Sequence, residues 1–310
     1  MMNVRLRDFI VTRDGWIFAV SDYTHTDGVR CVLRYVPDPR GSRGVTQRYR
    51  KFDFNESFEF MRRHRPAWVK DVHVVPFNEV ARVLVPSRRL AAIADTDERI
   101  AAIVNTLIEG GVPLSKMGIT GSFLAGLNNE SSDIDFIVYG KAWFRARDVI
   151  ARAKGQGGMI RELSGEIWQL IYNKRVPDIS FREFLMHEQR KGNRGMVGGT
   201  YFDLLYVRDW EDIETIERGT DIGRATITAN VTNADFSFDS PAVYKVEHKE
   251  VECVLSYTHT YAGQALPGEC IEASGMLEDA GGVKRLVVGT SREPRGEWIR
   301  SLTLLESEKD

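Results

Sequence analysis

One stretch constrains the fold of this chain more than any other: two short segments joined by a glycine turn and a polar loop. The first, Gly118–Thr120, ends at Gly121, which can take the backbone conformation that a sharp turn needs. The second, Asp133–Val138, is typical of a strand with alternating side chains. The order of these features predicts a strand, a tight turn, a short helix, a loop and a second strand.

The polar residues of this stretch point to a chemical site. Ser122 stands where the helix would begin, beside unpaired backbone N–H groups that suit phosphate oxygens. Asp133 and Asp135 share one face of their strand, with Cα atoms about 7 Å apart. Such carboxylates repel each other unless a cation lies between them, and Mg²⁺ accepts oxygen ligands of this kind beside substrate phosphates. A polar turn before an ordinary strand is the alternative interpretation.

These residues carry a resemblance to a known family. The pair Gly121-Ser122, Gly126 and the run Ser132–Asp135 resemble the Gly-Ser … Asp-x-Asp signature of DNA-polymerase-beta-type nucleotidyltransferases. The resemblance implies that the Gly-Ser pair holds the β- and γ-phosphates of a nucleoside triphosphate such as ATP. It also implies that both aspartates and a third carboxylate hold two Mg²⁺ or Mn²⁺ ions. Many relatives carry Tyr or Arg soon after the serine, whereas this chain has Phe123–Ala125, a departure on the substrate side of the site.

Asp203 is the candidate for the third carboxylate. It lies in the otherwise apolar run Tyr201–Val207, where a carboxylate is costly to bury unless it meets a partner or a metal. A strand beside that of Asp133 would bring Asp203 to the same site, and this fits the family's third metal ligand. The alternatives are an aspartate at a sheet edge facing water, or Asp178 as the ligand, although the sequence around Asp178 predicts a turn.

Two basic residues precede the Asp203 strand. Lys191 and Arg194 lie in a glycine-containing loop from which they could reach a triphosphate. A solvated loop explains them equally well. We carry both residues forward as candidate nucleotide-binding residues.

Charge and composition limit the class of protein. The net charge of −2 gives no global basicity, but residues 40–70 hold nine Lys or Arg against three acids. This segment could contact the phosphates of RNA or DNA, or it could be a solvated face. The three cysteines are unclustered, which argues against a disulfide framework or a zinc site. The charged amino terminus does not fit a signal peptide and no run reaches the length of a membrane span, so we expect a cytoplasmic protein without membrane contact.

We expect an α+β fold in three domains. Residues 1–90 should form a β-rich domain with a basic segment, and residues 91–221 the nucleotidyltransferase core, a mixed sheet with helices. Residues 222–310 should form a small antiparallel β-barrel or sandwich, because short strands recur there between Gly, Pro and Asn turns. This layout resembles that of archaeal predicted nucleotidyltransferases.

Local patterns place several elements within this layout. An Asp-Gly turn joins Phe9–Thr12 to Trp16–Val20 as a hairpin. Asn55 is expected to cap one helix, and Asp95 with Glu98 to cap another. The strands expected in the last part of the chain are 225–231, 242–246, 252–257, 269–276, 284–288 and 298–304.

The sequence thus predicts an enzyme that moves a nucleoside monophosphate from a triphosphate to an acceptor hydroxyl. The acceptor could lie on RNA or DNA, with residues 40–70 and the last domain as the nucleic-acid contacts. Transfer to a small molecule or a protein side chain is the alternative within the same chemistry. A nucleotide-binding protein without catalysis is the alternative outside it.

Overall fold

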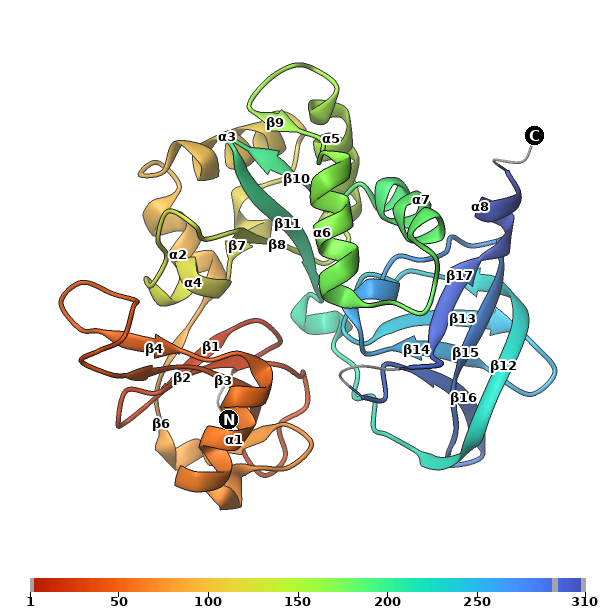
Figure 1. Ribbon diagram of the computed structural model, residues 1–310, viewed down its shortest axis with the longest axis horizontal. Coiled ribbons are helices and arrows are strands. Elements are labelled where there is room, and N and C mark those ends of the chain that lie inside the picture. The colour runs from red at the N-terminus through yellow and green to blue at the C-terminus, as the bar shows by residue number, and fades with distance from the viewer. Residues whose placement is uncertain (1–2, 292–294, 308–310) are drawn as a thin grey trace. The chain divides into compact units, whose positions relative to one another are not determined.

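The computed structural model describes residues 3–291 and 295–307 and confirms an α+β protein (Figure 1). By compactness the chain divides into two units. The first runs to Glu162 and includes Asn193–Thr215, and the second comprises Leu163–Gly192 and the chain from Ile216 onward. The division into three domains that the sequence predicts describes separately folding parts of the chain, and it stays a prediction. Within the described residues, no helix is long and apolar enough to cross a membrane.

The first unit begins with an antiparallel sheet. Its strands, in spatial order, are β4 (Tyr49–Lys51), β3 (Val29–Pro37), β2 (Ile17–Val20), β1 (Phe9–Thr12) and β6 (Val80–Leu84), and β5 (His73–Val75) also pairs with β3. The predicted hairpin is present as β1 and β2. Helix α1 (Phe54–His64) covers one face, where Met61 is buried with Val29 and Leu33.

A mixed sheet with helices follows, as predicted for the core. Its strands, in spatial order, are β7 (Met117–Ile119), β8 (Ile134–Tyr139), β11 (Thr200–Val207), β10 (Arg194–Val197) and β9 (Ile160–Arg161). The β8–β11 pair is parallel and the other pairs are antiparallel. The associated helices are α2 (Pro86–Ile93), α3 (Glu98–Glu109), α4 (Gly121–Ala125) and α5 (Ala142–Lys154).

Both helix caps predicted from the sequence are wrong by two residues. Helix α1 is capped by Asp53 rather than Asn55, because the Asp53 side chain accepts from the Glu56 amide and Glu56 bonds back to the cap. Helix α3 is capped by Asp97 rather than Asp95. Asn55 lies within the first turn of α1, and Asp95 lies two residues before the cap of α3. The residue that caps each helix is the one whose side chain reaches the first free amides.

In the second unit, six strands form one sheet, in which five close into a ring and β17 pairs with β15 outside it. Their order is β12 (Thr220–Asn233), β13 (Ala242–Glu247), β14 (Cys253–Ser256), β16 (Val283–Val288), β15 (Cys270–Ala280) and β17 (Trp298–Ser301), and β12 also pairs with β15. All six predicted strands are present, although the last one ends at Ser301 and a helix begins at Leu302. The predicted antiparallel barrel or sandwich is wrong in detail. Strand β15 follows β14 in sequence, and the next strand, β16, pairs with both of them. Because β16 is antiparallel to β15, it runs parallel to β14. Helices α6 (Gly165–Arg175), α7 (Phe181–Lys191) and α8 (Leu302–Glu306) complete this unit.

His187 of α7 links this helix to β17 in a way that depends on pH. Its Nδ1 donates to the Glu183 carbonyl (2.6 Å), so Nε2 is free to accept from the Ser301 amide (2.9 Å). Burial lowers the pKa of His187 to about 3. The neutral imidazole is therefore the form that fits the folded unit.

We expect the second unit to lose stability as the pH falls from 6.5 toward 3. In that window the unfolded chain binds a proton that the folded imidazole cannot take without losing its bond to Ser301. Urea unfolding at pH 7 and pH 5 measures the free energy of unfolding at each pH. In His187→Gln the difference between the two values, the pH slope, should be smaller. The matched change His64→Gln, at an exposed position, should leave the slope as in the unchanged protein. Equal slopes for His187→Gln and the unchanged protein would contradict this account.

Candidate active site

The two strands that carry the aspartates lie side by side (Figure 1). In the parallel β8–β11 pair, Asp135 is the register partner of Asp203, and the neighbouring pair, Ile134 with Phe202, is fully buried. Paired residues project to the same side of a sheet, so both carboxylates lie on one face and both apolar side chains on the other. Asp133, just before β8, is exposed. The strand of Asp203 is thus the neighbour that the sequence predicts.

The carboxylates influence one another electrostatically. Burial raises the pKa of Asp135 to about 7, and the charges of Asp133 and Asp203 contribute to this rise. The guanidinium groups of Arg7 and Arg34 partly offset it. The repulsion among these acids is the kind that a divalent cation between them would relieve.

Asp203 has two partners of its own. Arg194 is its register partner in the β10–β11 pair, and the buried Arg194 Nε donates to Asp203 Oδ2 (3.2 Å). The Asn193 amide nitrogen donates to Asp203 Oδ1 (2.9 Å). The structure therefore pairs Arg194 with a carboxylate, whereas the sequence predicts that Arg194 contacts a triphosphate. Sequence reasoning missed Asn193, because a single polar residue in a glycine-containing loop has no periodic pattern.

The carboxylates suit a hard divalent metal by their chemistry. Each carboxylate oxygen has two lone pairs, so Asp203 keeps acceptor capacity beside Asn193 and Arg194. In the part of the chain that the structure describes, no three His, Cys, Asp or Glu side chains converge closely enough to hold a metal ion. A shared metal therefore requires side-chain rotation, which the exposed Asp133 is free to make.

The glycine turn packs directly against one of the aspartates. Gly121 has φ +65°, and a Cβ at this position would lie 2.2 Å from Asp135 Oδ2. The Thr120 amide donates to the Asp135 carbonyl (2.9 Å), which holds the turn to β8. Ser122, in the first turn of α4, is buried, and Gly126 ends this helix in the left-handed conformation. The turn can therefore approach the Asp135 carboxylate this closely only because residue 121 is a glycine.

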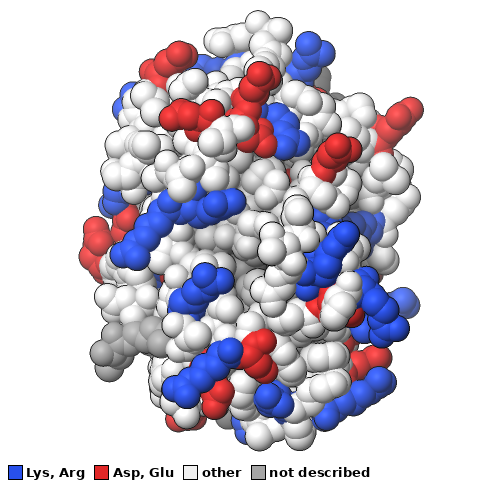
Figure 2. All heavy atoms as spheres, turned by 90° about the vertical axis from the view of Figure 1, so that its left-hand side faces the viewer, with Lys and Arg blue, Asp and Glu red and all other residues white. Residues whose placement is uncertain are grey.

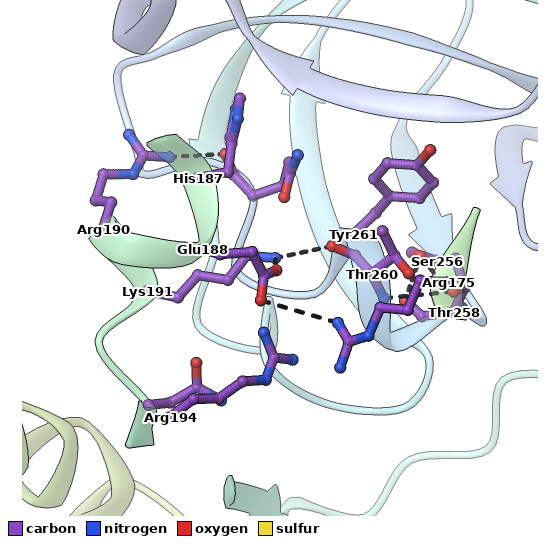
Figure 3. Close-up of polar contacts among 12 residues, drawn as sticks. Arg175, His187, Glu188, Arg190, Lys191, Arg194, Ser256, Thr258, Thr260 and Tyr261 are labelled. Carbon is purple, nitrogen blue, oxygen red and sulfur yellow. Dashed lines mark hydrogen bonds and ion pairs between the residues drawn. The ribbon is translucent and has the colours of Figure 1, made fainter. Parts of the chain in front are cut away.

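Lys191 belongs to the second unit and has local partners there (Figure 3). Its Nζ donates to Glu188 Oε1 (2.6 Å) and to the Thr260 carbonyl (2.8 Å), and both charged side chains are buried. Arg175 lies 3.8 Å from the second oxygen of Glu188. In this unit the Lys191 ammonium therefore joins α7 to the segment before β15.

The turn at Gly121-Ser122, the aspartate pair and Asp203 in register with Asp135 resemble the signature of polymerase-beta-type nucleotidyltransferases. Residues 98–191 match the family model of the nucleotidyltransferase domain, and the chain carries such a domain. It belongs to the same family as uncharacterized protein MJ1086 of Methanocaldococcus jannaschii, to which it is 37% identical over 338 residues. That similarity covers 96% of this chain and 99% of the relative. No solved structure matches the chain.

Proposed function

We propose that this protein is a metal-dependent enzyme that moves a nucleoside monophosphate from a triphosphate to an acceptor hydroxyl. The observation that supports this most is the register of Asp135 with Asp203 beside the turn at Gly121. Asp203 lies outside the segment matched by the family model, so its place in the sheet is independent support. The nucleotidyltransferase domain supports the reaction class, and the residues of the site support the roles below.

In this proposal Asp133, Asp135 and Asp203 hold Mg²⁺ or Mn²⁺. The bound metal would neutralise phosphate charge and favour ionisation of the acceptor hydroxyl. Arg194 and Asn193 are positioning residues, because each holds one oxygen of Asp203 and so limits its rotation.

The turn supplies the phosphate contacts in this proposal. Gly121 lets the backbone approach the phosphates closely, and Ser122 can donate its hydroxyl to the β- or γ-phosphate. Lys191 would have to leave Glu188 and Thr260 to contact a phosphate, so we propose a structural role for it instead.

Ser122→Ala should weaken triphosphate binding by roughly tenfold to a hundredfold. A hydrogen bond to a charged group contributes roughly 1.5–3 kcal/mol, and the loss of a single hydroxyl leaves the fold intact. Calorimetric titration with each of the four ribonucleoside triphosphates measures the effect. Ser115→Ala, an exposed serine, is the matched control and should bind as the unchanged protein does. Equal affinities for both variants would remove Ser122 from the site.

The acceptor is identified by a labelling experiment. The protein is incubated with labelled triphosphates, Mg²⁺ and total RNA, and the labelled product is separated into RNA, protein and small molecules. Label on RNA supports a nucleic-acid acceptor. Label on protein or on small molecules supports the other acceptors of this chemistry. Triphosphate binding without any labelled product would favour a nucleotide-binding protein without catalysis.

A further inference from the structure

The basic segment predicted from the sequence divides into two groups in the structure. Helix α1, with Arg62 and Arg63, packs on one face of the N-terminal sheet. The opposite face carries Tyr35 and Tyr49, which pack with Leu124 and Leu127 beside the Gly-Ser turn. Only the basic residues of this second face, which we call the site-facing side of the sheet, can therefore approach the aspartates.

Arg34 lies at a β-bulge on the site-facing side of β3. Ile17 pairs with Tyr35 but Phe18 pairs with Leu33, so Arg34 is an extra residue in β3. The bulge changes the alternation of the strand: Leu33 packs under α1, whereas Tyr35 packs on the other face. Bulges of this kind re-aim side chains next to active sites. Leu33 faces α1, so alternation along the strand places the Arg34 side chain on the opposite, site-facing side.

Lys51 and Arg43 lie on the same side. Lys51 is the register partner of Tyr35, and paired residues project to one face. Arg43 Nη1 donates to Ser132 Oγ (3.1 Å), the residue directly before Asp133. Tyr35, the register partner of Lys51, directly follows Arg34, so Arg34 and Lys51 lie on neighbouring strands of this side.

The three cations have no ion-pair partner within the described part of the chain. Among residues 3–291 and 295–307, no carboxylate forms an ion pair with Arg34, Arg43 or Lys51. In contrast, the neighbouring Arg50 pairs with Glu56. Figure 2 shows Lys and Arg side chains on either side of a hollow near the middle of one face of the molecule. Three positive charges on the side that faces two carboxylates favour a phosphate group that binds together with a divalent metal ion.

We infer that Arg34, Arg43 and Lys51 bind a phosphate group of a substrate opposite Asp133 and Asp135. The inference rests on the proposed function and adds the N-terminal sheet to the substrate site. Two substrates supply this chemistry: the triphosphate of the nucleotide, and a phosphate of a nucleic-acid acceptor.

The test compares two double variants of the full chain. Arg34→Gln/Lys51→Gln removes two charges from the site-facing side, and Arg62→Gln/Arg63→Gln removes two from exposed positions of α1. Binding of each ribonucleoside triphosphate, of inorganic tripolyphosphate and of total RNA is measured by calorimetry or filter retention. The circular dichroism spectrum and unfolding temperature of both variants should match those of the unchanged protein, and Arg34→Lys/Lys51→Arg should restore binding.

We expect the first variant to bind at least one phosphate probe tenfold or more weakly, and the second variant to bind as the unchanged protein does. Weaker triphosphate and tripolyphosphate binding with unchanged RNA binding assigns the surface to the nucleotide. Weaker RNA binding alone, with a shallower salt dependence, assigns it to the acceptor. Unchanged binding of all probes, or equal losses in both variants, overturns the inference.

Failure of this inference can be told from failure of the proposed function. If the unchanged protein transfers no label but the first variant loses phosphate binding, the surface is correct and the reaction is wrong. If Asp133→Asn abolishes transfer but both double variants bind and transfer normally, the reaction is correct and the surface is wrong.

Discussion

Asp133→Asn should reduce nucleotidyl transfer by at least about a thousandfold and leave the fold intact. Such a loss corresponds to about 4 kcal/mol of transition-state stabilisation, the scale expected when a charged ligand of a catalytic metal becomes neutral. Asp133 is exposed just before β8, so the substitution costs little stability. The rate of label transfer measures activity, and the unfolding temperature reports the fold.

The matched control is Glu130→Gln, which removes one negative charge from the same loop at an exposed position. It should retain the activity of the unchanged protein, because Glu130 lies outside the set of aspartates proposed to hold the metal. If Asp133→Asn keeps full transfer, the proposed active site is wrong. If both variants lose activity equally, the loop acts through its total charge and not through a metal ligand.

Gly121→Ala should greatly reduce both transfer and triphosphate binding. The residue has φ +65°, which costs roughly 1–2 kcal/mol for an L side chain, and the new Cβ would lie 2.2 Å from Asp135 Oδ2. The turn or the carboxylate must therefore shift, and a displacement of about 1 Å at a reacting centre can cost a hundredfold in rate. Label transfer and calorimetry with the triphosphates measure the two effects.

Gly157→Ala separates backbone strain from this contact. Gly157 has φ +73°, and a Cβ added there would have no atom within 4 Å, so the variant carries the same strain without a steric clash. It should lose stability only, by roughly 1–2 kcal/mol in urea unfolding, with transfer unchanged. Equal activities of the two glycine variants would show that the turn tolerates displacement and does not hold the phosphates.

The sequence alone determined the local elements. The segment from Gly118 to Val138 forms the predicted strand, turn, helix and strand, and the six strands of the last part of the chain are present. Glycine at a turn, alternation along a strand and the spacing of Asp133 and Asp135 are local properties. Each is decided by residues that are neighbours in sequence, so no knowledge of the remaining chain is needed.

Only the tertiary structure decided which distant residues meet. The β8–β11 register sets Asp203 opposite Asp135, and the β10–β11 register sets Arg194 on Asp203. Lys191 and Arg194 are close in sequence, yet the boundary between the two units falls between them. A shift of one residue in a strand would turn its side chains to the opposite face, and the sequence of one strand does not specify its partner's register.

The basic residues show most clearly the difference between what the sequence determines and what the tertiary structure decides. Their number was evident from the sequence, but their sorting into α1 and the site-facing side depends on packing. Arg34 and Tyr35, outside the basic segment, lie on the same side of the sheet because a bulge adds one residue to β3 relative to β2. A bulge is a mismatch between two strands, and it exists only once they pair. The sequence by itself therefore determined the spacing of the aspartate pair, and tertiary structure decided which basic residues lie on the site-facing side.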